Sequence, residues 1–174
     1  IYYRNELRSI HKNGVKLQPI YEAFTNSWES ILEKYTAEHL NLGSIVIEFH
    51  YNAGMFEEDH ENNLKNLQKI IITDNGIGLN EESFTRLLNL RDNSKSKNNK
   101  GTGRIQYLHY FDDTIFESVY KVGDNNFRKI CLTLSKKETF LQANAILRKD
   151  FEEETDIDKT YAKVELHTIL DYKN

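Results

Sequence analysis

Three short motifs, in a fixed order along the chain, constrain most strongly what this sequence can fold into. They are Glu22-Ala23-Phe24-Thr25-Asn26-Ser27-Trp28-Glu29, then Asp74-Asn75-Gly76-Ile77-Gly78, then Lys100-Gly101-Thr102-Gly103-Arg104. Each motif is weak by itself, because similar spacings occur in many unrelated proteins. Their order and the segments around them carry more information than any one of them.

The first motif lies in a segment with helical periodicity. Between residues 17 and 40, apolar residues recur at helical spacing, at Ile20, Phe24, Trp28, Ile31, Leu32 and Tyr35. On this helix Glu22, Asn26 and Glu29 share one face, since they are four and three residues apart. An amide oxygen can ligate Mg²⁺, and a glutamate one turn earlier can accept a proton from water. Ordinary surface residues of an exposed helix show the same spacing.

The second motif follows a β-branched run at residues 69–73, which predicts a strand that ends at Asp74. A carboxylate in this position can accept the exocyclic amine of adenine. Gly76 and Gly78 would let the backbone approach the base without an intervening Cβ. A plain Asp-Asn-Gly turn between a strand and a helix explains these residues equally well.

The third motif precedes a short apolar helix, expected at residues 104–111. Free N–H groups at a helix N-terminus, with glycines ahead of them, bind anions such as polyphosphate. Residues 91–100 are rich in Asn, Ser and Lys and predict a mobile loop. The candidate phosphate contacts are therefore Lys95, Lys100, Gly101, Thr102, Gly103 and Arg104. The alternative is a solvated basic loop that happens to contain two glycines.

The remaining segments predict an α/β fold. Strands are expected at residues 44–51, 114–122, 127–135 and 159–170, with a hairpin turn at Gly123-Asp124 and a helix over 80–90 capped by Asn80. Residues 52–68 read as a solvated hairpin insertion. Residues 139–154 fit either a short helix or an edge strand with an acidic loop. Together these predict a single domain over residues 1–174, a two-layer sandwich of one mixed sheet with helices on one face.

Composition excludes several classes of protein. The chain has 174 residues and a net charge of −4, which argues against a surface devoted to nucleic acid. Its single cysteine, Cys131, has no internal disulfide partner and is expected in the core of a cytoplasmic protein. No apolar run reaches the length of a membrane span, so no membrane partner is expected. Because the chain starts at Ile1, we expect a fragment of a longer protein.

The three motifs in this order resemble those of the GHKL superfamily, which comprises gyrase, heat-shock chaperones of the ninety-kilodalton class, histidine kinases and MutL. The resemblance extends from Glu22 to about His167 and implies the Bergerat fold with ATP and Mg²⁺ as cofactors. By this resemblance Glu22 is the general base, Asn26 the Mg²⁺ ligand and Asp74 the adenine contact. Gly76 and Gly78 would lie beside the base, Gly101 and Gly103 along the phosphates, and Ser94-Lys95 in a lid over ATP.

The resemblance implies a slow ATPase whose lid closure drives an ATP-dependent homodimer or an effector, with a nucleic acid or protein client reached through further domains. Glu22 favours hydrolysis over phosphotransfer to histidine. The chain departs from the family pattern at Glu29, which replaces an aspartate, and at Trp28, which replaces a small residue and is expected to fill the core. Ala162 stands where a threonine often binds adenine, with Thr160 nearby. The alternative is a non-hydrolysing nucleotide-sensing or interaction module.

Overall fold

The computed structural model describes residues 3–9, 18–52, 67–80, 83 and 103–170. In chain order the elements are α1 (Tyr3–Ser9), α2 (Gln18–Lys34), the 3₁₀ helix η1 (Ala37–Leu42), β1 (Ile45–Tyr51), β2 (Leu67–Asp74), α4 (Gly103–Tyr110), β3 (Phe111–Val122), β4 (Asn126–Ser135), α5 (Glu138–Gln142), β5 (Leu147–Thr155) and β6 (Tyr161–Ile169).

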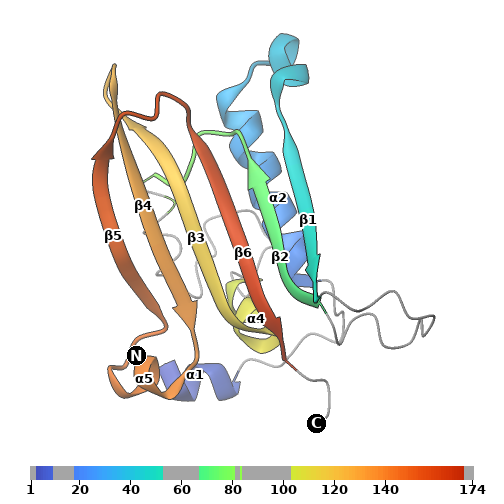
Figure 1. Cartoon of the computed structure of the whole chain (residues 1–174), viewed down its shortest axis with the longest axis vertical. Helices are drawn as coiled ribbons and strands as arrows, with labels where there is room; N and C mark the ends of the chain where they lie inside the picture. The colour runs from blue at the N-terminus through green and yellow to red at the C-terminus, as the bar shows by residue number, and fades with distance from the viewer. Residues whose placement is uncertain (1–2, 10–17, 53–66, 81–82, 84–102, 171–174) are drawn as a thin grey trace, which may run out of the picture.

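The six strands form one sheet in the order β1-β2-β6-β3-β4-β5, with α2 and α4 on the same face (Figure 1). The predicted two-layer α/β sandwich is therefore confirmed. A mixed sheet was expected, whereas every strand pair among the described residues is antiparallel. The last strand, β6, explains this difference, because it enters between β2 and β3 and runs opposite to both. As a result β2 lies between β1 and β6 in the sheet.

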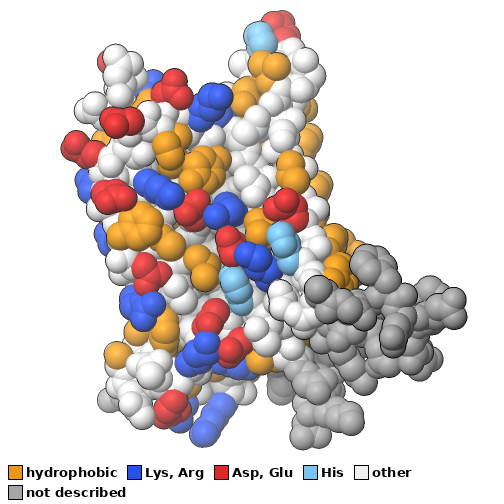
Figure 2. Space-filling view, viewed as in Figure 1, with side chains coloured by type: hydrophobic (Ala, Val, Ile, Leu, Met, Phe, Trp, Pro, Cys, Tyr) orange, Lys and Arg blue, Asp and Glu red, His pale blue; other side chains and the backbone are white. Residues whose placement is uncertain are grey.

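The core lies between the sheet and the two helices. Ile72 of β2, Leu132 of β4 and Leu166 of β6 are fully buried there, together with Tyr107 and Leu108 of α4. The other face of the sheet is uncovered and carries charged side chains mixed with apolar ones (Figure 2). An antiparallel sheet tolerates this asymmetry, because its side chains alternate between the two faces.

The buried face of α2 differs from the prediction. Pro19, Ala23, Ser27 and Ile31 are its buried residues. The prediction that Trp28 fills the core is wrong, because 42% of this residue is exposed. Small side chains face the sheet instead, and they let another segment of the chain approach the helix closely.

Most other elements lie where the sequence places them, including the turn at Gly123-Asp124. The predicted helix over residues 17–40 ends at Lys34, and η1 follows after the extended Thr36. Both alternatives for residues 139–154 are present, as α5 and then β5. The helix α1 was not predicted. Cys131 was expected in the core, but it is only partly buried on β4, so this prediction is wrong.

Several predictions fall wholly or mostly outside the described residues. They concern the insertion at 52–68, the loop at 91–100 and most of the helix over 80–90. The cap of that helix is seen, since Asn80 Oδ1 accepts a hydrogen bond from the Ser83 N–H at 2.9 Å. In the part of the chain that the structure describes, no helix has the length and apolar character needed to cross a membrane.

Candidate functional site

Asp74 is a buried carboxylate at the end of β2, with only 4% of the residue exposed. Its Oδ1 accepts a hydrogen bond from the Gly76 N–H at 2.9 Å. The hydroxyls of Ser27 and Ser30 on α2 donate to the same carboxylate. Burial raises the pKa of Asp74, and these donors offset the rise only in part. A buried acid whose hydrogen-bond donors among the described residues are all neutral is therefore held beside α2.

Hydroxyl groups from three elements hold the backbone of the loop after Asp74. The Ile77 N–H donates to Ser30 Oγ at 3.0 Å, and the Leu79 N–H donates to Ser118 Oγ of β3 at 2.6 Å. Thr160, just before β6, donates its hydroxyl to the Gly76 carbonyl at 2.5 Å. Because α2, β3 and the start of β6 each contribute one of these contacts, the loop has a defined conformation.

The two glycines of the loop are required by close packing against protein. A Cβ on Gly76 would lie 2.1 Å from Ser30 Oγ, and a Cβ on Gly78 would lie 2.2 Å from the Val119 carbonyl oxygen. Gly78 also has a φ of +81°, which disfavours other residues. Sequence reasoning assigned these glycines to the approach of a base and did not foresee their packing role.

The Asn75 side chain connects the loop to the segment between η1 and β1. Its Oδ1 accepts the Ser44 N–H and its Nδ2 donates to the Leu42 carbonyl, both at 2.8 Å. Lys34, at the C-terminus of α2, donates to the Asn75 carbonyl at 2.6 Å. Asn75 thus ties the end of β2 to α2 and to the segment that enters β1.

The remaining residues of the first motif lie along α2. Glu22, Asn26 and Ser30 are four residues apart and form one row, which ends at the contact between Ser30 and Asp74. Glu22 is half-buried and accepts a hydrogen bond from Gln18 Nε2 at 3.0 Å, whereas Asn26 is exposed. A rise of 1.5 Å per residue places Ser30 about 12 Å along the helix from Glu22. The row is therefore long enough to lie along an elongated ligand, and Asp74 is at one end of it.

The third motif is described only in part. Lys95, Lys100, Gly101 and Thr102 lie outside the described residues. The backbone of Gly103 and Arg104 begins α4, which packs against α2. The prediction that this motif leads into a helix is therefore confirmed, and its contact with phosphate stays a prediction.

We did not predict from the sequence the serine hydroxyls that hold Asp74 and its loop, namely Ser27, Ser30 and Ser118. One signal was present, because Ala23, Ser27 and Ser30 form a run of small residues at spacings of four and three on one helix face. Such a run indicates that another segment lies against the helix. Ala162 lies opposite Asp74 in the β2–β6 ladder, and Thr160 contacts the loop from two residues earlier.

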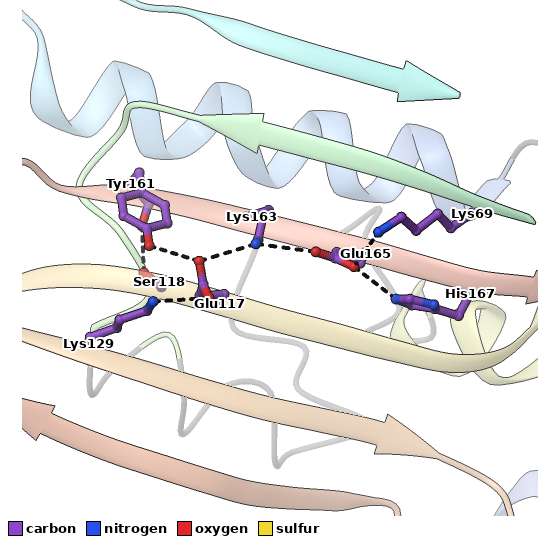
Figure 3. A network of polar contacts seen from close by, with 8 residues as sticks. All are labelled: Lys69, Glu117, Ser118, Lys129, Tyr161, Lys163, Glu165 and His167. Atoms are coloured by element: carbon purple, nitrogen blue, oxygen red, sulfur yellow. Dashed lines mark hydrogen bonds and ion pairs between the residues drawn. The ribbon is translucent and has the colours of Figure 1, made fainter. Parts of the chain in front are cut away.

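A second polar cluster lies on the open face of the sheet (Figure 3). Glu117 accepts the Tyr161 hydroxyl at 2.9 Å and pairs with Lys129 and Lys163, each at 3.2 Å. Glu165 pairs with Lys163 at 3.2 Å and Lys69 at 3.3 Å, and contacts His167 at 2.9 Å. Burial acts to raise the pKa of both glutamates, but the hydrogen bonds and the lysine charges lower it below the usual value. Both carboxylates of this cluster are paired with lysines of the protein, so the cluster has the character of a structural network.

No family model matches this chain, and no curated protein matches it. Among solved structures it is similar to the ATPase region of topoisomerase II from Saccharomyces cerevisiae, with 15% sequence identity and a TM-score of 0.42. The similarity covers 60% of this chain and 32% of that one, so the chain spans about a third of the length of the structure it matches.

Proposed function

We propose that this domain binds ATP along α2, with adenine at Asp74 and the phosphates toward Glu22 and the start of α4. The single observation that carries the proposal is the environment of Asp74. It is buried, its donors in the part of the chain that the structure describes are neutral, and it lies at the end of the row formed by Glu22, Asn26 and Ser30. A carboxylate held in this way can accept one further hydrogen bond from a donor group of a ligand.

The hydrogen-bonding capacity of Asp74 fits one such donor. An ionised carboxylate has about four acceptor positions. The Gly76 N–H and the hydroxyls of Ser27 and Ser30 fill three of them. The remaining position suits an amino group such as N6 of adenine. Burial strengthens this hydrogen bond, because the surroundings screen it less than water does.

Asn26 and Glu22 carry the proposed chemistry. The amide oxygen of Asn26 supplies a hard ligand for Mg²⁺, which when bound offsets the charge of the phosphates. Glu22, held by the Gln18 amide, accepts the proton of the attacking water. The N–H groups at the start of α4, with Gly101, Gly103, Lys95 and Lys100, stabilise the phosphate charge. Turnover is slow, and closure of the segment around Lys95 over ATP drives dimerisation or an effector domain.

Calorimetric titration with a non-hydrolysable ATP analogue and Mg²⁺ tests the adenine contact. We expect the wild type to bind and Asp74→Asn to bind at least tenfold more weakly, because Asn offers an N–H₂ group to the amine. Glu117→Gln on the open face is the matched control and keeps the wild-type affinity. Equal affinities of the wild type and Asp74→Asn contradict the proposal, as does a folded wild type that does not bind.

Hydrolysis is tested separately with Glu22→Ala. We expect this variant to keep its affinity for the analogue and to lose turnover of ATP by a factor of at least 10². Phosphate release under single-turnover conditions provides the measurement. If the wild type and Glu22→Ala release phosphate at the same rate, the domain is the non-hydrolysing sensing or interaction module.

A further inference from the structure

Exposed apolar side chains gather on one side of the molecule, on α2 and the edge strand β1. Tyr21, Phe24, Trp28 and Leu32 of α2 and Ile47 and Phe49 of β1 are between 36 and 55% exposed. We call these six residues the apolar flank. Figure 2 shows hydrophobic side chains along the β1 edge of the sheet. A contiguous apolar surface of this kind marks an interaction site.

The α2 part of the flank faces the β1 edge. Ser27 and Ser30 contact the loop at Asp74, on the side of the helix toward the interior of the sheet. Each residue turns the helix by about 100°, so Phe24 and Trp28 lie on the other side. In Figures 1 and 3 α2 runs beside β2 and β1, which agrees with its contacts to both strands.

The β1 part of the flank lies on the same face of the sheet as the helices. Ile47 and Phe49 pair with Ile72 and Ile70 in the β1–β2 ladder, and both of these partners are buried under the helices. Residues directly opposite in a ladder point to the same face. The α2 and β1 parts are therefore neighbours in one helix-side surface.

A partner that covers this whole surface must supply a strand for the β1 edge and a helix for the α2 part of the apolar flank. Within the described residues β1 pairs only with β2, so its outer edge presents unpaired N–H and C=O groups. A single added strand would satisfy that edge but would leave the α2 part exposed. A second copy of this chain supplies both layers, because a two-fold axis perpendicular to the sheet places β1 beside β1 and α2 beside α2.

The charges of β1 favour a second copy and select its register. Glu48 and His50 lie on the open face, with side chains 54% and 42% exposed and with Glu48 Oε2 3.9 Å from His50 Nε2 of the same chain. An antiparallel pair centred on Glu48 would place two carboxylates opposite each other, which is destabilising. A pair centred on Phe49 places Glu48 opposite the partner's His50 on both sides of the axis. In this register the Phe49 side chains of the two copies lie opposite each other on the helix side.

We propose that two copies of this chain pair through β1 in the register centred on Phe49. The pairing forms one continuous twelve-stranded sheet from the two six-stranded ones. The apolar flanks cover each other on the helix side of that sheet. This contact involves none of the residues assigned to ATP, so it forms without nucleotide. It is a separate contact from any dimerisation driven by ATP and does not depend on the proposed function.

Charge reversal tests the pairing by sedimentation velocity without nucleotide. We expect the wild type to be a dimer, and Glu48→Lys and His50→Glu each to weaken the dimer at least tenfold. The double variant restores it, because each Lys then faces a Glu. An equimolar mixture of the two single variants also forms dimers, for the same reason. Glu153→Lys on β5, at the opposite edge of the sheet, is the matched control and remains dimeric.

Circular dichroism of each variant separates loss of pairing from loss of folding. A wild type that is monomeric at about 100 µM, a concentration at which even a weak dimer is populated, overturns the proposal. A dimer that survives Glu48→Lys but is lost in Trp28→Ser also overturns it, because the copies would then meet through α2 alone. Failure of the double variant and of the mixture to restore the dimer overturns the register.

Discussion

Carboxylates on the two faces of the same sheet, one buried and two partly buried, have opposite electrostatic environments. On the helix-covered face, Asp74 accepts hydrogen bonds from one backbone N–H and two serine hydroxyls. On the open face, Glu117 and Glu165 are paired with lysines (Figure 3). Burial acts to raise the pKa of all three groups. The pKa of Asp74 stays raised, and those of the two glutamates are lowered.

This difference agrees with the proposed ligand contact of Asp74 and with a structural role of Glu117 and Glu165. The charges of Glu117 and Glu165 are compensated by cations of the protein itself. Among the described residues, Lys34 is the cation that acts on the charge of Asp74. Its influence ranks below burial and the hydrogen bonds, and its ammonium group donates to the Asn75 carbonyl. Since the protein leaves the compensation of Asp74 incomplete, a ligand with an amino group can complete it.

The largest expected effect concerns the backbone that holds Asp74 in this environment. Gly78 and Gly123 both have positive φ, but only Gly78 lacks room for a Cβ. We expect Gly78→Ala to lower the free energy of unfolding by about 3 kcal/mol, from strain plus overpacking, and Gly123→Ala to lower it by about 1 kcal/mol from strain alone. Urea unfolding measures both. Equal losses would show that the packing against Val119 does not constrain the loop.

The second prediction tests the opposite pKa shifts through stability against pH. Glu165 has a lowered pKa in the folded protein, so its stabilisation is present above its unfolded pKa and is lost as pH falls through the folded pKa. Asp74 has a raised pKa, so the stability linked to its proton is present at low pH and is lost as pH rises through the folded pKa.

We therefore expect the two differences in unfolding free energy to change oppositely with pH. The difference between wild type and Glu165→Gln, about 1 kcal/mol at neutral pH, shrinks as the solution is acidified. The difference between wild type and Asp74→Asn shrinks as pH rises over the same range. Urea unfolding at intervals between roughly pH 3 and 7, which brackets the ordinary carboxyl values, gives both curves. Slopes of the same sign would remove the contrast between the two faces.

The smallest expected effect concerns Tyr161, which donates to Glu117. Burial and this hydrogen bond raise the pKa of Tyr161 to about 12. Its contribution to stability is therefore lost as pH rises from the ordinary value of about 10 through the folded value. Burial also raises the pKa of Tyr110, so tyrosinate absorbance should show a late-titrating component that becomes smaller in Tyr161→Phe. Glu117→Gln should lower the pKa of Tyr161, and an unchanged late titration in that variant would contradict the assigned hydrogen bond.

The sequence predicted the parts of the site that depend on neighbouring residues in the chain. The β-branched run before Asp74 predicted a strand ending there, and the apolar segment after Gly103 predicted a helix. The buried face of α2 was predicted less well. Phe24 and Trp28 fit helical periodicity, yet both are exposed, because the loop at Asp74 packs so closely that only small residues fit beneath it.

The sequence by itself determined the local chemistry, which is a carboxylate at a strand end, two glycines after it, and a helix that carries a glutamate and an asparagine one turn apart. Only the tertiary structure decided the environment of that carboxylate. Ser30 and Thr160, 47 and 84 residues away from the loop atoms they bind, reach it because α2 covers the sheet and β6 enters beside β2. Burial and pKa depend on such distant neighbours, and the spacing of residues along a chain does not encode which of them will meet.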